Sequence, residues 1–310
     1  MDSLEAVQST NDDASECKRC AVDLNYWKDK YIHFFVRHYE RKTPEINRGY
    51  FARVCGVNAV VKSFLDKTGN KCQIINLGCG FDTLYWRLKE NNFNISNFID
   101  VDFPTVTARK CHSIKRNNVL LQSLHNEDGE ISFRDTDLHS FNYHITGVDL
   151  RNINDLEYKL LQCGVDYNLP TLFISECVLI YIEPSYTQRL LMWITSNFKQ
   201  ALFVNYEQMN MNDRFSEVMI KNLRERGCAL AGLEACKTKE TQKQRFLNCG
   251  WSGCRVWDMM QIYMSIPGAE RQRIEALEFL DEQELLFQLL QHYAISVAWK
   301  GDLLKDVDIT

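Results

Sequence analysis

Short apolar segments that alternate with helical patterns constrain the fold of this chain more than any other feature of its sequence. From residue 72 onward, five apolar runs have the length and composition of buried strands, and segments with apolar residues three or four positions apart lie between them. Strands that alternate with helices form parallel sheets with helices on both faces. We therefore predict an α/β protein with a doubly wound, Rossmann-like sheet. The five runs are QIINL (73–77), NFIDVD (97–102), YHITGVD (143–149), TLFISE (171–176) and ALFVNYE (201–207).

The other segments place helices and a tail around this sheet. Tyr50, Val54 and Val57 belong to an apolar stripe within residues 23–66, which predicts helical structure there. Because no linker divides the chain, we predict a single domain over residues 17–310. Its parts are N-terminal helices (17–66), a cofactor-binding sheet core (72–207), an inserted helical lid (208–250) and a C-terminal region that completes the sheet (251–310), and the polar residues 1–16 are expected to be disordered.

The composition is typical of a soluble globular protein in a reducing compartment. The 310 residues carry a net charge of -5, and 45% of them are hydrophobic. No apolar run approaches the ~18 residues that a membrane span needs, and the polar N-terminus has no signal-peptide pattern. The cluster KTKETQKQR (237–245) mixes charges at helical spacing, which indicates a solvated helix face rather than a nucleic-acid site. Twelve cysteines without a secretion signal predict free thiols and a cytoplasmic protein that can also be nuclear.

A glycine turn follows the first strand and is a candidate ligand site. Gly78 and Gly80 lie between this strand and a helical segment, so the backbone and the helix N-terminus can both approach a ligand. A dinucleotide site needs a third glycine where Thr83 stands, which disfavours a nicotinamide oxidoreductase. An adenosine without phosphates needs only the two glycines and a carboxylate that accepts the ribose hydroxyls, and Asp102 ends the next strand. An ordinary strand-to-helix turn is the alternative.

Two further carboxylates lie at the ends of the third and fourth predicted strands. Asp149 ends the third strand, where it can face an adenine edge or, alternatively, cap the following helix. Glu176 ends the fourth strand within an apolar run, where an unpaired carboxylate is costly to bury. A ligand ammonium can pair with Glu176, and so can an arginine or lysine of the protein. Together the strand ends fit ribose, adenine and a zwitterionic amino acid, and we therefore predict S-adenosylmethionine as the cofactor.

Six longer motifs, between Thr43 and Phe215, extend this pattern within a stretch that runs from about Cys17 to Lys300. They are TPEINRGYFARVCG (43–56), NLGCGFDTLYWRL (76–88), DVDFP (100–104), GVDLR (147–151), ECVLIYIEP (176–184) and NYEQMNMNDRF (205–215). These motifs resemble those of the leucine carboxyl methyltransferase family, apart from Cys79 in place of alanine and Asp100 in place of glutamate. The resemblance implies a class I S-adenosylmethionine-dependent methyltransferase fold with N-terminal helices and a helical substrate lid.

The resemblance also implies a reaction, a partner and a set of contacts. The methyl acceptor would be the C-terminal leucine carboxylate of the protein phosphatase 2A catalytic subunit, whose methylation regulates holoenzyme assembly, and we expect the enzyme to be a monomer. Arg53 would hold the methionine carboxylate, Glu176 the ammonium and Asp102 the ribose. Arg53 also neighbours the apolar stripe of its helix and can reach inward, although a surface arginine lying over the core is the alternative. The further cofactor contacts are Lys18, Gly78, Asp149, Leu150 and Tyr181, and the glycine turn adds Gly80.

We predict no catalytic base for this reaction. A terminal carboxylate has a pKa near ~3.5 and is ionised at neutral pH, so catalysis requires alignment of the reacting atoms and exclusion of water. Tyr206, Gln208 and Arg214 lie just beyond the fifth strand and are candidates for binding the leucine carboxylate, although they can equally bind one another. Because CKRC (17–20) has no second cysteine pair, we predict no metal site. A catalytically inactive, methyltransferase-like binding module is the alternative function.

Overall fold

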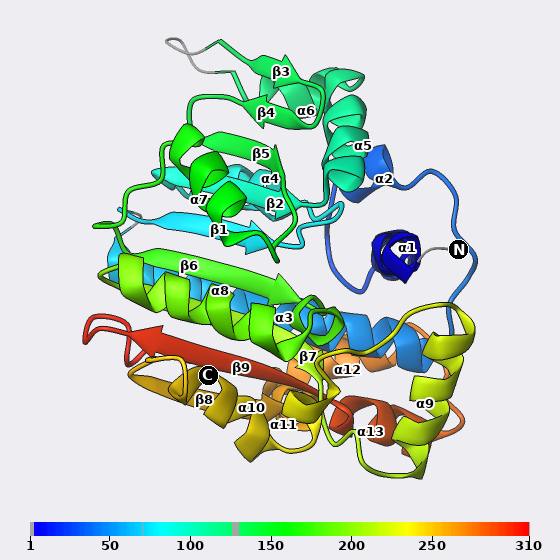
Figure 1. The fold of residues 1–310 in the computed structure, drawn as a ribbon. Coiled ribbons are helices and arrows are strands. Elements are labelled where there is room, and N and C mark those ends of the chain that lie inside the picture. Colours follow the sequence, from blue (N-terminus) through cyan, green and yellow to red (C-terminus); the bar gives the residue numbers. More distant parts are fainter. Residues whose placement is uncertain (1–2, 70, 126–129, 310) are drawn as a thin grey trace.

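The computed structural model describes residues 3–69, 71–125 and 130–309, and a mixed sheet of nine strands forms the centre of this part of the chain (Figure 1). The strand order is β3-β4-β5-β2-β1-β6-β7-β9-β8. The run from β5 to β7 is parallel, whereas β9 is antiparallel to both of its neighbours. The predicted doubly wound sheet is confirmed. The strands are β1 (Gln73–Leu77), β2 (Asn97–Asp102), β3 (Ser132–Arg134), β4 (Asp137–His139), β5 (Tyr143–Gly147), β6 (Thr171–Glu176), β7 (Ala201–Gln208), β8 (Gly253–Asp258) and β9 (Tyr293–Lys300).

Helices cover both faces of the sheet. They are α1 (Ser3–Asp23), α2 (Ile32–Phe35), α3 (Pro44–Thr68), α4 (Leu84–Glu90), α5 (Pro104–Lys115), α6 (Asn118–Gln122), α7 (Ile153–Gln162), α8 (Pro184–Asn197), α9 (Arg214–Glu225), α10 (Lys239–Leu247), α11 (Met259–Ser265), α12 (Gly268–Glu275) and α13 (Gln283–Gln291), with short 3-10 helices at Leu179–Tyr181 and Leu233–Cys236. Successive residues of a strand point to opposite faces. Ile74 therefore packs in a cluster with side chains of α3, α4 and α5, whereas Ile75 packs in a second cluster with those of α7, α8 and α10.

The N-terminal segment differs from the sequence-based expectation. Residues 3–23 form helix α1, so the prediction of a disordered tail over residues 1–16 is wrong for its described part, and residues 1 and 2 lie outside the described residues. The buried face of α1 consists of small side chains, which give a weak apolar signal, and it includes Ala6, Ser15 and Ala21. In Figure 1 the arrowheads of β1 and β6 point toward α1, which lies at the carboxyl edge of the parallel strands. Within residues 24–66, α2 and nearly the whole of α3 are helical, whereas residues 24–31 and 36–43 lie outside the helices.

The predicted lid divides into two parts with different positions. Helix α9 lies near α1, and Arg226, just after α9, forms an ion pair with Asp13. Helix α10 instead packs against β8 and β9, and Phe246 is fully buried on that face of the sheet. The expectation that the whole of residues 208–250 covers the top of the sheet is therefore wrong for α10. The sequence reading also missed β3 and β4, which are three residues each and form an antiparallel extension at one edge.

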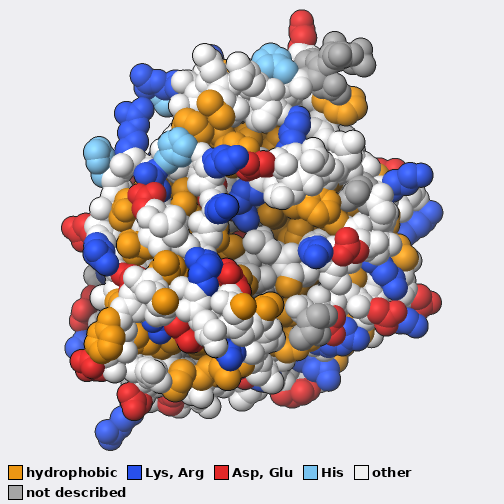
Figure 2. Space-filling view, turned by 180° about the vertical axis from the view of Figure 1, so that it is seen from behind, with side chains coloured by type: hydrophobic (Ala, Val, Ile, Leu, Met, Phe, Trp, Pro, Cys, Tyr) orange, Lys and Arg blue, Asp and Glu red, His pale blue; other side chains and the backbone are white. Residues whose placement is uncertain are grey.

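The surface carries charges of both signs. Figure 2 shows Lys and Arg side chains interspersed with Asp and Glu over one face of the molecule. Among the described residues, no helix combines the length and apolar character needed to cross a membrane.

A buried ion pair holds the turn after β1 against its neighbours. Lys110 of α5 is fully buried, and its Nζ donates to Asp100 Oδ2 at 2.8 Å and to the carbonyl oxygen of Asp82 at 2.9 Å. The Tyr143 hydroxyl donates to the same Asp100 oxygen at 2.6 Å. Burial raises the pKa of Asp100, while Lys110 and Tyr143 act in the opposite direction. These bonds link β2, β5 and α5 to the segment that follows the glycine turn.

Replacement of Lys110 should therefore be strongly destabilising. Lys110→Met leaves the Asp100 carboxylate buried without its cation, which typically costs about 3–5 kcal/mol in the free energy of unfolding. Urea unfolding measures this loss. Lys115→Met, at an exposed position of the same helix, is the matched control and should change stability little. The double variant Asp100→Asn with Lys110→Met should recover part of the loss, and equal stability of Lys110→Met and Lys115→Met would contradict the role of the ion pair.

Candidate active site

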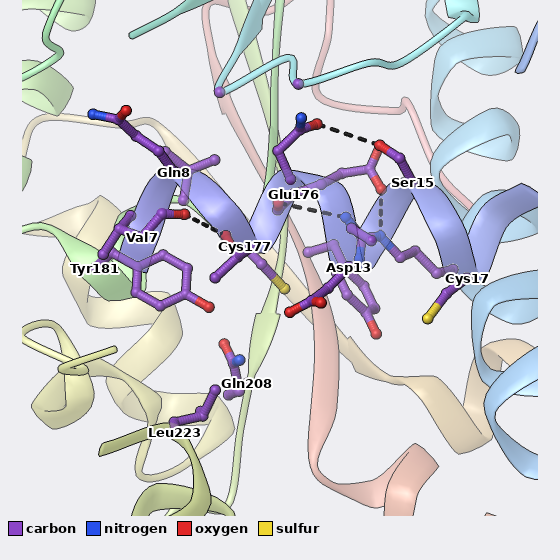
Figure 3. Close-up of a pocket in the computed structure, with 18 of the residues that line it drawn as sticks. Val7, Gln8, Asp13, Ser15, Cys17, Glu176, Cys177, Tyr181, Gln208 and Leu223 are labelled. Atoms are coloured by element: carbon purple, nitrogen blue, oxygen red, sulfur yellow. Dashed lines mark hydrogen bonds and ion pairs between the residues drawn. The ribbon is translucent and has the colours of Figure 1, made fainter. Parts of the chain in front are cut away.

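The described residues enclose a pocket of about 630 Å³ at the carboxyl ends of the parallel strands. Figure 3 shows α1 running across this pocket, with Glu176 and Cys177 against it and Gln208 and Leu223 on the side toward α9. The walls come from α1, α3, α9 and α13, from the glycine turn, and from the ends of β2, β5, β6 and β7. The position agrees with the rule that open α/β sheets bind ligands beyond the carboxyl ends of their strands.

The glycine turn leaves no room for side chains. Gly78 and Gly80 have positive φ angles of 65° and 48°. A Cβ at residue 78 would lie 2.3 Å from Val178 Cγ2, and a Cβ at residue 80 would lie 2.2 Å from Asn11 Oδ1. The same Asn11 oxygen accepts a hydrogen bond from the backbone N–H of Phe81 at 2.9 Å. Helix α1 is therefore packed directly against the turn, and only glycine fits at these two positions.

Asp102 faces the pocket from the end of β2. Its side chain accepts hydrogen bonds from the backbone N–H groups of Gly80 and Phe103, each at 2.7 Å. Burial raises the pKa of Asp102 to about 6, although both hydrogen bonds act to lower it. The carboxylate is thus fixed in orientation and close to titration at neutral pH.

A cluster of buried charges forms the floor of the pocket. Arg53 Nε forms an ion pair with Glu176, and Lys18 Nζ lies 3.6 Å from the same carboxylate. Burial alone would raise the pKa of Glu176, but Lys18 and Arg53 hold it below its ordinary value. Asp82 lies 4.0 Å from Lys18 and 3.6 Å from Arg87, and these cations hold its pKa at about 2 despite burial. Glu176 therefore pairs with cations of the protein itself, as the alternative in the sequence analysis allowed.

Aromatic side chains surround the Arg53 guanidinium. Its central carbon lies 4.5 Å from the ring centroid of Tyr206 and 5.4 Å from that of Tyr50. Tyr206 stacks on Tyr293 with a centroid separation of 5.3 Å. Cys177 has a φ angle of 58°, which is rare for a residue with a side chain, and its N–H donates to the Tyr206 carbonyl oxygen at 2.7 Å. Such strained residues concentrate at functional sites.

The end of β5 contributes Asp149 and Leu150 to the pocket wall. The Asp149 carboxylate pairs with Arg151 at 2.5 Å, and this pairing holds its pKa below the ordinary value against the effect of burial. The alternative that Asp149 caps the following helix is wrong, because Asn152 is the N-cap of α7 and accepts from the Asp155 backbone N–H.

The structure brings together almost all of the predicted site residues. Arg214 is the exception: it is exposed at the start of α9 and is not among the described residues that line the pocket. On α1, sequence reasoning found only Lys18 and missed Asn11, since no motif marks Asn11 and residues 1–16 were expected to be disordered. The predicted residues that line the pocket are Lys18, Arg53, Gly78, Gly80, Asp102, Asp149, Leu150, Glu176, Tyr181, Tyr206 and Gln208.

A solved structure shares this fold. The chain resembles a protein from Thermobifida fusca described as a methyltransferase, with a TM-score of 0.53 and 12% identity over 87% of this chain and 93% of that chain. The chain thus shares the fold of this methyltransferase.

Sequence comparison places the chain more narrowly. The sequence profile of the leucine carboxyl methyltransferase family matches residues 6–195. Leucine carboxyl methyltransferase 1 of Bos taurus is 51% identical over 96% of this chain and 90% of that protein. The tRNA wybutosine-synthesizing protein 4 of Rattus norvegicus is 37% identical over 98% of this chain but only 45% of that protein. The chain belongs to the leucine carboxyl methyltransferase family, and the resemblance found in its motifs is confirmed.

The packing of α1 on the glycine turn predicts different effects at two glycines. Gly69 and Gly80 both have positive φ, but a Cβ at residue 69 would meet nothing within 4 Å. Gly69→Ala should cost about 1 kcal/mol in unfolding free energy from backbone strain alone. Gly80→Ala should cost about 1–3 kcal/mol more, because Asn11 must move and the Phe81 N–H loses its acceptor. Chemical denaturation of both variants tests this, and Gly80→Ala combined with Asn11→Ala should relieve the steric part. Equal losses for the two single variants would show that α1 does not pack on the turn in solution.

Proposed function

We propose that this protein uses S-adenosylmethionine to methylate the α-carboxylate of the C-terminal leucine in the catalytic subunit of protein phosphatase 2A. The cofactor supplies a methyl group on a sulfonium that is already activated. The contacts expected from the sequence support its binding in the pocket: Asp102 beside the ribose, and Asp149 and Leu150 beside the adenine. Gly78, Gly80 and Tyr181 complete the surface around it.

The charge cluster favours a zwitterionic ligand end. Arg53, Lys18 and Glu176 together carry a net charge of +1, so a carboxylate can pair with the two cations while an ammonium takes a free oxygen of Glu176. With the ammonium and the carboxylate of the ligand in place, positive and negative groups alternate through the cluster. Each charged group then has a neighbour of opposite sign. A neutral or purely cationic ligand end would not satisfy this arrangement.

The acceptor side of the pocket suits a leucine. Apolar side chains of α9 and α13, among them Met219, Leu223 and Leu289, line the pocket opposite the charge cluster. Gln208 is buried there, and its Oε1 has no hydrogen-bond partner within the described part of the chain. Its amide N–H groups can donate to the leucine carboxylate, which needs no base because it is already ionised.

The observation that carries the proposal is the placement of the charge cluster, the Asp102 carboxylate and this apolar wall around one pocket. The family membership supports the reaction type, and the phosphatase as substrate rests on the motif resemblance. We further propose that the protein acts as a monomer in the cytoplasm, and also in the nucleus, without membrane or nucleic-acid partners.

Transfer of labelled methyl groups tests the acceptor. The protein, labelled S-adenosylmethionine and the phosphatase catalytic subunit should give label on the subunit, and none when its last residue is removed or its terminal carboxyl is amidated. Gln208→Leu should lower kcat/KM by at least ~5-fold through loss of a hydrogen bond to a charged group, while Arg214→Ala, outside the pocket, should change it little. Transfer RNA serves as a second acceptor. Label on tRNA or on the amidated subunit would exclude the proposed acceptor, and cofactor binding without any transfer would support the inactive binding module.

Asp102 predicts how cofactor affinity depends on pH. Because burial raises the pKa of Asp102 to about 6, the carboxyl becomes protonated as the pH falls through this value and can no longer accept both ribose hydroxyls. Calorimetry should show that affinity for S-adenosylmethionine is nearly constant from about pH 7 to 7.5 and falls below about pH 6. Asp102→Asn should bind weakly with little change over this range. Asp149→Asn is the control: its affinity for S-adenosylmethionine should still fall at low pH, since the pKa of Asp149 is held below its ordinary value. A parent protein whose affinity stays constant down to about pH 5 would exclude Asp102 from the ribose site.

A further inference from the structure

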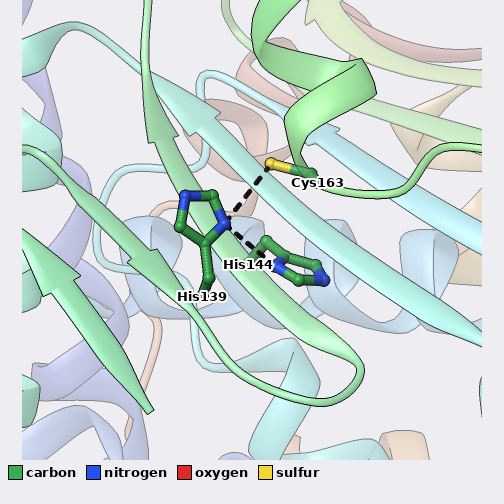
Figure 4. A group of neighbouring side chains, drawn as sticks. All are labelled: His139, His144 and Cys163. Carbon is green, nitrogen blue, oxygen red and sulfur yellow. Dashed lines mark hydrogen bonds between the residues drawn. The ribbon is translucent and has the colours of Figure 1, made fainter. Parts of the chain in front are cut away.

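A second group of chemically reactive side chains lies on the sheet outside the pocket (Figure 4). His139 on β4 and His144 on β5 are direct cross-strand partners in the antiparallel pair, so their rings project from the same face. Cys163, the C-cap residue of α7, covers this face. Figure 4 shows the three side chains directed toward one another. Two residues of one hairpin and a cysteine 24 positions beyond His139 thus converge at one point.

The separations of the ligand atoms are close to those of a metal centre. His139 Nδ1 lies 3.1 Å from His144 Nδ1 and 4.0 Å from Cys163 Sγ. All three ligand atoms lie within 4.8 Å of one another. In a tetrahedral zinc site with the usual bond lengths, neighbouring nitrogen and sulfur ligands are about 3.3–3.6 Å apart. A shift of about 1 Å in side-chain positions would give that geometry.

The chemistry of the three side chains suits metal binding. Imidazole nitrogens and a cysteine sulfur are the ligand atoms that zinc most often takes in proteins. Asp137, Arg134 and Lys159 are charged groups near His139, and Lys159 pairs with Asp137 at 2.6 Å. Cys163 is buried, and its thiol would release a proton to solvent when a cation binds.

We propose that His139, His144 and Cys163 bind a Zn²⁺ ion, with a water molecule as the fourth ligand. Two imidazoles and one thiolate form a ligand set that zinc commonly takes, and three protein ligands leave one position open to solvent beside the partly exposed His139. The ion links the C-terminal end of α7 to the β4–β5 hairpin. Since Asp149 and Leu150, which line the pocket, precede the opposite end of α7, the site is separate from the methyl-transfer pocket.

Zinc binding by the full-length protein tests the proposal. The purified chain is treated with EDTA, freed of chelator and titrated with Zn²⁺ in competition with a chromophoric chelator. We expect one tightly bound Zn²⁺ per chain and a rise in Tm on its addition. Cys163→Ser and His144→Gln should each weaken this binding by at least ~100-fold, since loss of a ligand exceeds the effect of losing an outer-shell partner. Co²⁺ should give a thiolate-to-metal charge-transfer band in the parent protein and none in Cys163→Ser.

Matched variants separate this site from the other thiols. Cys249 is also buried and also follows a helix C-terminus, so Cys249→Ser should bind Zn²⁺ like the parent. Two ligand variants are used because serine in a buried position can destabilise the fold, and circular dichroism identifies any variant that has unfolded. A parent protein that binds no Zn²⁺ in competition with the chelator, or folded ligand variants that bind it as well as the parent, would overturn the proposal.

Discussion

The turn that ends β1 is the constraint on which the rest of this structure depends. The backbone at Gly78 and Gly80 must pass within contact distance of Val178 on one side and Asn11 on the other, in a conformation that residues with side chains adopt only with strain. The turn is held by the Asp102 carboxylate and, beyond it, by the buried Lys110 ammonium. Elements distant in the sequence thus meet at one short segment of backbone, and the pocket forms around it.

Charge burial explains why this pocket is suited to a polar ligand. Glu176 and Asp82 keep low pKa values inside the protein because Lys18, Arg53 and Arg87 lie close to them. Such a cluster is costly to desolvate and contributes little net stability by itself. Its value lies in orientation, because fixed charges meet a ligand without the rearrangement that flexible surface groups would need. The proposed zwitterionic cofactor end makes use of this property.

The contrast between α1 and α9 shows how the two walls of the pocket differ. Helix α1 buries small residues such as Ala6 and Ala21 and contacts the glycine turn through Asn11. Helix α9 has one fully buried residue, Ser216, and presents Val218 with 59% of its surface exposed at the pocket rim. The pocket thus combines an exposed apolar side chain at its rim with a buried charged floor.

The sequence by itself determined the sheet and most of the site, because these features depend on local patterns. Buried parallel strands are continuous apolar runs in the sequence, so β1, β2 and β6 have the predicted bounds. The polar residues at the ends of these strands line one pocket because parallel strands end at a common edge of the sheet. Only the tertiary structure decided where α1 and α10 lie, which cations pair with Glu176, and that Arg214 stays outside the pocket. It also decided the meeting of His139, His144 and Cys163. The physical reason is that these contacts form between different elements, through small or polar side chains, and local apolar periodicity does not indicate the partners of such side chains.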